Sequence, residues 1–218
     1  MLRQTINDIW FRFARWWCRV FCKAFFRMRF YGIENIPATG PFIIASNHQS
    51  FLDPLFAGIC IRPVCFMARD TLFKNWFFGP LLLSVNAIPV RRGQADIASI
   101  RLILEKLKQG RGVCLFPEAT RTTDGKIASL KGGFTLLSRR GNAPVIPVLI
   151  DGAFECWPRH KKLFKSGSKI TVTYGKAVTV EQIAAMEDEQ FAALLTDTLR
   201  NMQTQTRISQ GKQPFEYL

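Results

Sequence analysis

The sequence is poor in histidine and in acidic residues. Only two histidines, His48 and His160, occur among 218 residues, and 16 acidic residues face 30 lysines and arginines. None of the six cysteines belongs to a C-x-x-C pair, so the histidine and cysteine content argues against a zinc site. Several cysteines lie in apolar runs, which predicts buried, reduced thiols in a reducing, cytoplasmic compartment.

Several recognisable segments are also missing. No run of about 18 uncharged apolar residues is present, so the sequence predicts no standard membrane span. Arginines interrupt the apolar N-terminal stretch, which excludes a secretory signal. The sequence contains no Gly-x-Ser-x-Gly nucleophile elbow, no internal repeat and no recognised nucleic-acid-binding signature. Nucleic-acid binding therefore ranks last among the functions that a basic chain allows.

The composition is that of a folded, basic protein. Hydrophobic residues make up 48% of the chain, and the length suits one domain, or one domain with an added terminal element. The net charge of +14 favours an anionic partner such as an acidic membrane surface or a phosphorylated substrate. The 19 phenylalanines beside many arginines suit a lipid interface better than a nucleic-acid groove.

Residues 1–30 form a candidate N-terminal membrane-surface element. Aromatic residues there alternate with five cations at helical spacing: Arg12, Arg15, Arg19, Lys23 and Arg27. This pattern predicts an amphipathic helix that lies in the headgroup plane of an anionic bilayer, attached peripherally or monotopically to the cytoplasmic face of the inner membrane. The alternative is a helix packed on the domain with a solvated basic stripe.

Residues 31–202 are predicted to form an α/β domain, with a mixed, mostly parallel sheet flanked by helices. Strands are expected at 42–46, 64–68, 86–93, 112–116, 143–150 and 170–174, and helices from 54, at 95–108, at 130–140 and at 180–202. The apolar stretch 71–85, broken at Gly79-Pro80, suits either an acyl channel or ordinary core. Residues 203–218 are predicted to be a polar, fraying tail.

The corner between the expected strand 42–46 and the next helix carries His48 and Asp53. A neutral imidazole can take a proton from a hydroxyl near pH 7, and a carboxylate on its other nitrogen fixes the tautomer. The two side chains meet most easily if His48 lies in the turn and Asp53 in the first helical turn, where Ser50 and Asp53 have capping-box spacing. A helix cap beside an ordinary turn histidine is the alternative.

Two further strand ends carry charged side chains. The strand 86–93 carries Arg91 and Arg92 at its end, and an arginine fork matches phosphate oxygens. The strand 112–116 leads directly into a carboxylate, a hydroxyl and an arginine, at Glu118, Thr120 and Arg121. Lys131, near the start of a helix, can hold an anion with the helix dipole, although a surface lysine is the commoner explanation.

Taken together, these segments resemble the glycerolipid acyltransferase family, typified by lysophosphatidic acid acyltransferase, over roughly residues 30–180. Asn47–Asp53 looks like the first family block, and Ile88–Arg92 resembles the second, with Arg91 where an acidic residue is common. Phe116–Thr122 is similar to the third block, normally Phe-Pro-Glu-Gly-Thr-Arg-Ser, with Ala119 in place of glycine. Val145–Val148 looks like the fourth.

The resemblance implies a role for each matched residue. His48 would be the general base and Asp53 its orienting partner. Glu118, Thr120 and Arg121 would position the acceptor, with Arg92 and Lys131 on its phosphate. The implied donor is an acyl thioester of coenzyme A or acyl carrier protein, with no metal and no cofactor, and the implied acceptor is a lysophospholipid.

Three hypotheses follow for the function. The first is a membrane-surface O-acyltransferase that converts 1-acyl-glycerol-3-phosphate to phosphatidic acid. The second is an acyltransferase with a related acceptor, such as lyso-ornithine lipid, to which the alanine at position 119 points. The third is a non-enzymatic basic protein that binds membrane or nucleic acid through charge alone.

Overall fold

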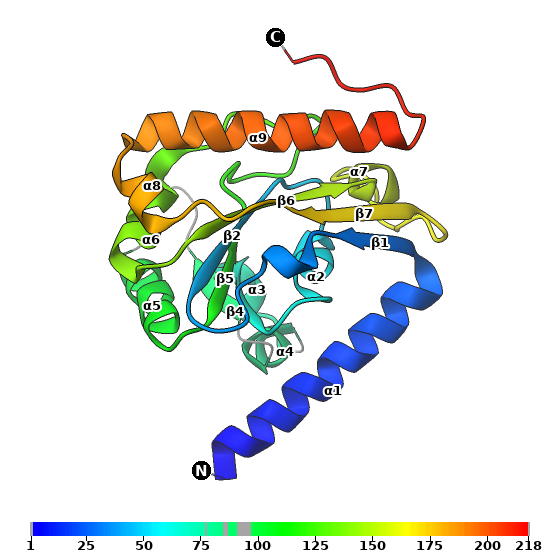
Figure 1. The fold of residues 1–218 in the computed structure, drawn as a ribbon. Coiled ribbons are helices and arrows are strands. Elements are labelled where there is room, and N and C mark those ends of the chain that lie inside the picture. The colour runs from blue at the N-terminus through cyan, green and yellow to red at the C-terminus, as the bar shows by residue number, and fades with distance from the viewer. Residues whose placement is uncertain (1, 77, 85–86, 91–96, 218) are drawn as a thin grey trace.

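Seven strands form a mixed sheet in the computed structural model of the protein, which describes residues 2–76, 78–84, 87–90 and 97–217 (Figure 1). Their order is β1-β7-β6-β2-β5-β3-β4, and only β6 and β7 pair antiparallel. The predicted α/β class, with a mixed and mostly parallel sheet, is confirmed. The strands are β1 (Arg27–Tyr31), β2 (Phe42–Ser46), β3 (Val64–Arg69), β4 (Ala87–Val90), β5 (Gly112–Leu115), β6 (Val145–Asp151) and β7 (Lys169–Tyr174).

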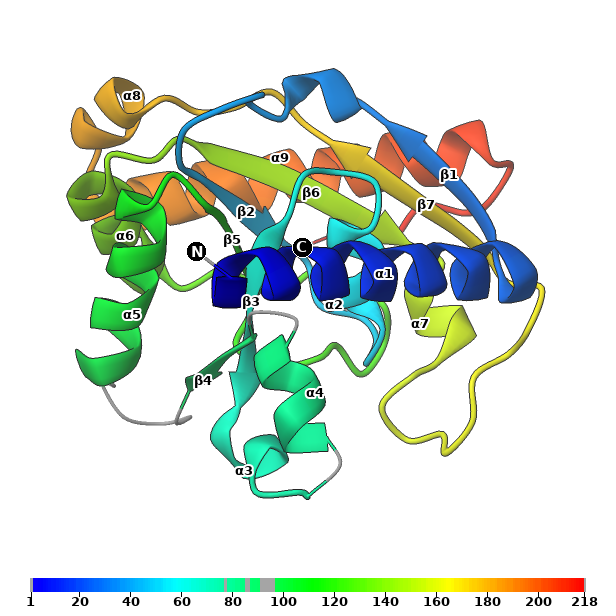
Figure 2. The ribbon, with the colours of Figure 1, turned by 90° about the horizontal axis from the view of Figure 1, so that it is seen from below.

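Helices cover both faces of this sheet, so the central strands β2, β5 and β6 are buried along their whole lengths (Figures 1 and 2). One face packs against α5 (Ile97–Lys108), α6 (Thr135–Gly141), α8 (Val180–Ala184) and α9 (Asp188–Ser209). The other packs against α1 (Leu2–Phe25), α2 (Asp53–Gly58) and α7 (Ala153–Cys156). Two short helices, α3 (Asp70–Phe73) and α4 (Phe78–Ser84), and two 3-10 turns, Ile33–Asn35 and Gly132–Phe134, complete the described elements.

The N-terminal helix is present, but it is shorter than the sequence pattern suggests. Helix α1 ends at Phe25, and Arg27, the fifth cation of the predicted basic face, lies in strand β1 instead. Helical periodicity failed here because Arg27 and Arg29 also fit a strand, where alternate residues share one face. Met28 and Phe30 of this strand pack into the core on the α1 face of the sheet.

Two cations of α1 bind the protein itself. Arg15 donates to the carbonyls of Ile59 and Ile61, and Arg19 Nε donates to the Ile59 carbonyl at 3.0 Å. The expectation of a basic stripe exposed to lipid headgroups or to solvent is therefore wrong for Arg15, which is partly buried, whereas Arg19 stays exposed while it makes its contact. The side chains that α1 exposes include large aromatic ones: Trp10, Phe13, Trp16, Trp17 and Phe25. Among the described helices, none is long and apolar enough to cross a membrane.

Two other elements differ from expectation. Gly79 and Pro80 do not break the apolar stretch 71–85 but lie in the first turn of α4, where proline is tolerated. The segment 180–202 contains two helices rather than one, and the second continues to Ser209. The tail beyond does not fray, because the Tyr217 hydroxyl accepts from the Ile127 amide at 3.0 Å and donates to Gln203.

Candidate active site

Two loops meet at the carboxyl edge of the central strands. Strands β2 and β5 are parallel neighbours, with Ala45 beside Leu115, so the segments that follow them emerge at the same edge of the sheet. We call residues 47–53 the histidine loop and residues 116–130 the glutamate loop. The main chain of His48 joins them, because its amide donates to Glu118 Oε1 at 2.6 Å and its carbonyl accepts from the Thr122 amide at 2.8 Å.

The predicted contact between His48 and Asp53 is present. Nδ1 of His48 lies 2.7 Å from Oδ2 of Asp53, which is the first residue of α2 and is completely buried. The imidazole stacks on the ring of Phe116 with the centroids 4.2 Å apart, and 12% of its side chain is exposed. Since Nδ1 is held by the carboxylate, Nε2 is the nitrogen that can accept a proton from a hydroxyl.

Main-chain amides hold the carboxylate of Asp53 in this position. The same oxygen that contacts His48 also accepts hydrogen bonds from the amides of Gln49, at 2.6 Å, and Ser50, at 2.7 Å. Burial raises the pKa of Asp53, and the hydrogen bonds from His48, Ser50 and Gln49 oppose that rise. Only part of the predicted capping box exists, because Leu52 is the N-cap residue and the Ser50 side chain does not cap α2.

The imidazole of His48 lines a largely apolar pocket of about 620 Å³. Its walls come from β3, α5, the glutamate loop and α6, and its cationic lining residues within the described part of the chain are Arg69 and Lys131. No described residue of the apolar stretch 71–85 lines this pocket, although the sequence suggested an acyl channel there. A pocket that is apolar along most of its wall and cationic at two points suits an amphipathic anion such as a phospholipid.

Glu118 connects the two loops rather than pointing freely into the pocket. Its Oε1 accepts from the His48 amide and its Oε2 accepts from the Ala128 amide, at 2.6 and 3.1 Å. Burial raises the pKa of Glu118 to about 7, while these two hydrogen bonds lower it. The geometry therefore gives Glu118 a hold on the main chain of His48, and its predicted contact with an acceptor remains a prediction.

The other predicted binding residues do not all lie together. Thr120 and Arg121 line a second, polar pocket of about 460 Å³ that also reaches Glu118, whereas Lys131 lines the apolar pocket with His48. The Arg121 guanidinium lies 5.6 Å from the centroid of the Phe51 ring. Arg92, the predicted phosphate ligand, lies outside the described residues.

Three features of this site were not expected from the sequence. Arg69 was not proposed, although an arginine at the end of a strand was the signal that singled out Arg92. The stacking of Phe116 under His48 and the contact of Tyr217 with the glutamate loop had no signal in the sequence, because both depend on the three-dimensional arrangement. Ala119, noted only as a departure from glycine, has a left-handed backbone with φ 61°.

A carboxylate-held histidine at the mouth of an apolar pocket, on an α/β sheet, defines an enzyme site that can activate a hydroxyl group. Comparison with known proteins identifies the family. The acyltransferase family model matches residues 27–151, and the chain belongs to this family. The protein is therefore an enzyme of the acyltransferase class, as the resemblance of its strand-end motifs implied.

Three similar proteins are named as acyltransferases that act on 1-acyl-sn-glycerol-3-phosphate. A 1-acyl-sn-glycerol-3-phosphate acyltransferase of Bacillus subtilis is 31% identical over 174 residues, which cover 79% of this chain and 84% of the relative. The enzyme of that name from Pseudomonas aeruginosa is 33% identical over 153 residues, covering 69% of this chain and 58% of the relative. The crystal structure of the 1-acyl-sn-glycerophosphate acyltransferase PlsC from Thermotoga maritima shares the fold, with a TM-score of 0.77 at 24% identity, covering 92% of this chain and 81% of that one.

Proposed function

We propose that the protein transfers a fatty acyl chain from an acyl thioester to the free hydroxyl of 1-acyl-glycerol-3-phosphate, giving phosphatidic acid. The observation that carries this proposal is the 2.7 Å contact of His48 Nδ1 with Asp53, at a pocket that is apolar but flanked by cations. The names of the similar proteins support the same acceptor.

In the proposed reaction, His48 Nε2 takes the proton of the acceptor hydroxyl as its oxygen attacks the thioester carbonyl carbon. The buried carboxylate of Asp53 stabilises the imidazolium that forms. The tetrahedral intermediate then expels the thiolate, which receives the proton from His48, so the histidine returns to its neutral state. The donor is acyl-coenzyme A or an acyl carrier protein, and the reaction uses neither a metal ion nor a cofactor.

The acceptor phosphate is proposed to bind the cations of the pocket. Arg69 and Lys131 line it together with His48, and Arg92 is a further candidate from the sequence. Thr120 and Arg121, with Glu118, would position the acceptor from the polar pocket beside it. Because a guanidinium binds phosphate oxygens more specifically than an ammonium, Arg69→Ala is expected to raise KM for the phosphorylated acceptor more than Lys131→Ala does.

In this proposal, the enzyme binds its acceptor and its donor at an anionic membrane surface on the cytoplasmic side. Trp10, Phe13, Trp16 and Trp17 are each at least 43% exposed on α1, while Arg15 and Arg19 fix this helix to the domain. Exposed aromatic rings on a helix next to a lipid-modifying site favour interfacial binding without a membrane span.

A reconstituted assay tests this function. Purified protein receives one radiolabelled acyl thioester and, in separate reactions, 1-acyl-glycerol-3-phosphate, other lysophospholipids and lyso-ornithine lipid, and the products are resolved. We expect phosphatidic acid as the dominant product. A dominant product from another acceptor would move the assignment to that lipid, and no thioester consumption with any acceptor would reject acyl transfer.

A further inference from the structure

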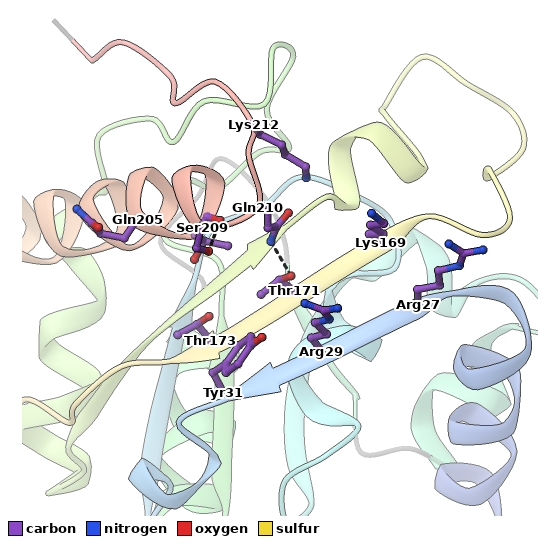
Figure 3. Close-up of a pocket in the computed structure, with 11 residues that line it drawn as sticks. Arg27, Arg29, Tyr31, Lys169, Thr171, Thr173, Gln205, Ser209, Gln210 and Lys212 are labelled. Atoms are coloured by element: carbon purple, nitrogen blue, oxygen red, sulfur yellow. Dashed lines mark hydrogen bonds between the residues drawn. The ribbon is translucent and has the colours of Figure 1, made fainter.

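A second cleft, of about 970 Å³, lies on the α9 face of the sheet at strands β1 and β7, away from the His48 pocket (Figure 3). Strand alternation directs Met28 and Phe30 into the core on the α1 face, so Arg27, Arg29 and Tyr31 project to the α9 face. There they join Lys169 of β7 and Lys212, which follows α9. This cleft therefore concentrates four cations on a part of the sheet that α9 leaves open.

The cations of this cleft are poorly neutralised. Arg27 lies directly beside Lys169 in the parallel register of the two strands, and like charges on neighbouring strands repel. Among the described residues, no carboxylate lines the cleft and no ion pair involves Arg27, Arg29 or Lys169. Lys212 differs from these three because it has an acidic partner, Asp151, at 3.1 Å. A bound anion would offset the repulsion between Arg27 and Lys169.

The other lining residues suit a phosphorylated ligand. Thr173 and Ser209 supply hydroxyl groups, and Gln210 is held in place by a 2.8 Å hydrogen bond from its Nε2 to Thr171 Oγ1 (Figure 3). Tyr31 is 52% exposed and offers a ring face at the end of the row that begins with Arg27. The C-terminal end of α9 brings a partial negative charge of about half a unit, which four cations outweigh.

The position of the cleft distinguishes a soluble ligand from a membrane lipid. Helix α1, with its exposed aromatic rings, lies on the opposite face of the sheet from α9 (Figures 1 and 2). A protein bound to a bilayer through α1 would therefore direct the cleft away from the lipid headgroups. Its volume is also within the range of small-molecule sites, about 300–1,000 Å³.

We propose that this cleft binds a soluble nucleotide with several phosphates, with the phosphates against Arg27, Arg29 and Lys169 and the base stacked on Tyr31. Two sources share this chemistry. One is a free nucleotide that acts as a regulator, and the other is the phosphorylated adenosine end of an acyl-coenzyme A donor. The second source rests on the proposed function, whereas the binding site itself does not.

Binding is tested by calorimetry on the full chain, with adenosine 3′,5′-bisphosphate and with pyrophosphate at low salt. Arg27→Gln/Lys169→Gln is expected to weaken binding of both probes about tenfold or more, because it removes two charge-assisted contacts. Lys108→Gln/Arg140→Gln makes the same charge change at exposed positions on α5 and α6 and should leave both affinities nearly unchanged. Tyr31→Ala should weaken only the nucleotide, by about fivefold or more.

A kinetic measurement separates the two sources. If the nucleotide is part of the donor, Arg27→Gln/Lys169→Gln raises KM for acyl-coenzyme A but not for an acyl-phosphopantetheine, which lacks the adenosine. If it is a free regulator, neither KM for the donor changes and the bisphosphate alters the rate without competing with the donor. Both results support the site, and the binding experiment stands even if the protein transfers no acyl chain.

Three outcomes would overturn the proposal. The first is no binding of either probe to the unmodified chain, and the second is equal weakening in the control variant. The third is capture of phosphatidylglycerol vesicles that depends on Arg27 and Lys169 while the nucleotide fails to bind, which would assign the cleft to lipid headgroups. Thermal unfolding of each variant verifies that a lost affinity is not a lost fold.

Discussion

The pair of His48 and Asp53 and the glutamate loop are held in place by contacts of different range. In the histidine loop, the oxygen of Asp53 accepts from the side chain of His48 and from the amides of Gln49 and Ser50, all within five residues. In the glutamate loop, main-chain groups bind side chains from the far end of the sequence. These contacts are Leu130 to Thr196, Ile127 to Arg200 and Tyr217, and Gly125 to Gln203.

This difference shows that the pair of His48 and Asp53 is assembled locally, while the wall facing it depends on the C-terminal helix and tail. Glu118 is the connection between the two, because it accepts from the amide of His48 and from that of Ala128. Replacing His48 should therefore reduce activity more than it reduces stability. Damage to the supports of the glutamate loop should reduce stability first and activity second.

Replacing His48 is the strongest test of the contrast between the locally assembled pair and the glutamate loop. His48→Ala is expected to lower kcat for acyl transfer about 10³-fold, because it removes general-base catalysis. The substitution also removes the imidazole that lies against the fully buried carboxylate of Asp53, so the melting temperature should fall, and kcat is compared at a temperature where both proteins are folded. A variant that retains a tenth of the rate would show that another group acts as the base, and His160→Ala, on an exposed loop, is the matched control.

Removing the orienting charge comes next. Asp53→Asn is expected to lower kcat about 10²-fold or more, because an amide neither fixes the His48 tautomer nor stabilises its imidazolium. The substitution also costs stability, since two amides donate to this oxygen. Parallel measurement of kcat and of the melting temperature separates the two effects. An unchanged kcat would remove Asp53 from the mechanism.

The connection between the loops predicts a pH effect on stability. Burial raises the pKa of Glu118 from 4.5 to about 7, so the folded protein holds this proton more tightly than the unfolded chain does. Its contribution to the free energy of unfolding is therefore complete below about pH 4.5 and is lost as the pH rises through about 7. At about 1.4 kcal/mol per pKa unit, the loss is at most about 3.5 kcal/mol.

Denaturant unfolding between pH 4 and pH 8 checks this expectation. The unmodified chain should lose stability over this range more steeply than Glu118→Gln, because glutamine does not titrate. Both proteins share all other titrating groups, so the effects of those groups on stability cancel in the comparison. Parallel curves would mean that Glu118 ionises normally in the folded protein.

The remote support of the glutamate loop predicts a smaller effect. Tyr217→Phe removes a hydroxyl that binds the Ile127 amide and Gln203, so it should lower the free energy of unfolding by about 1 kcal/mol and kcat only severalfold. Tyr31→Phe, at an exposed position, is the matched control and should have nearly unchanged stability. Equal stability of the two variants would argue that the tail does not support the loop.

The smallest predicted effect is a gain in stability. Ala119 adopts a left-handed backbone that an alanine side chain disfavours, so Ala119→Gly should raise the free energy of unfolding by about 1 kcal/mol. The same substitution at Ala193, exposed within α9, should lower it by about 0.5–1 kcal/mol. Urea unfolding of both variants measures the contrast, and a loss of stability in Ala119→Gly would show that its methyl group makes contacts that outweigh the strain.

The sequence predicts the structure best where the determining contacts join residues that are close together in the chain. The strand Phe42–Ser46 and the helix Ile97–Lys108 were expected within two residues of their observed bounds, because apolar runs and helical spacing are local signals. The contact of His48 with Asp53 was expected for the same reason. Strand β1 was missed because its cations continued the helical spacing of α1. The tail was expected to fray because it is polar. The contact that holds it joins Tyr217 to Ile127, 90 residues away, and no local pattern signals such a contact.

The sequence by itself therefore determined the class of fold and the contact of His48 with Asp53, because the signals for both lie in the order of side chains along short stretches of the chain. The tertiary structure alone decided that Arg15 and Arg19 fix α1 to the domain, that Glu118 holds the main chain of His48, and that Arg27 lies beside Lys169. These contacts join residues that are far apart in the chain. They follow from the register and order of the strands, which no local pattern encodes.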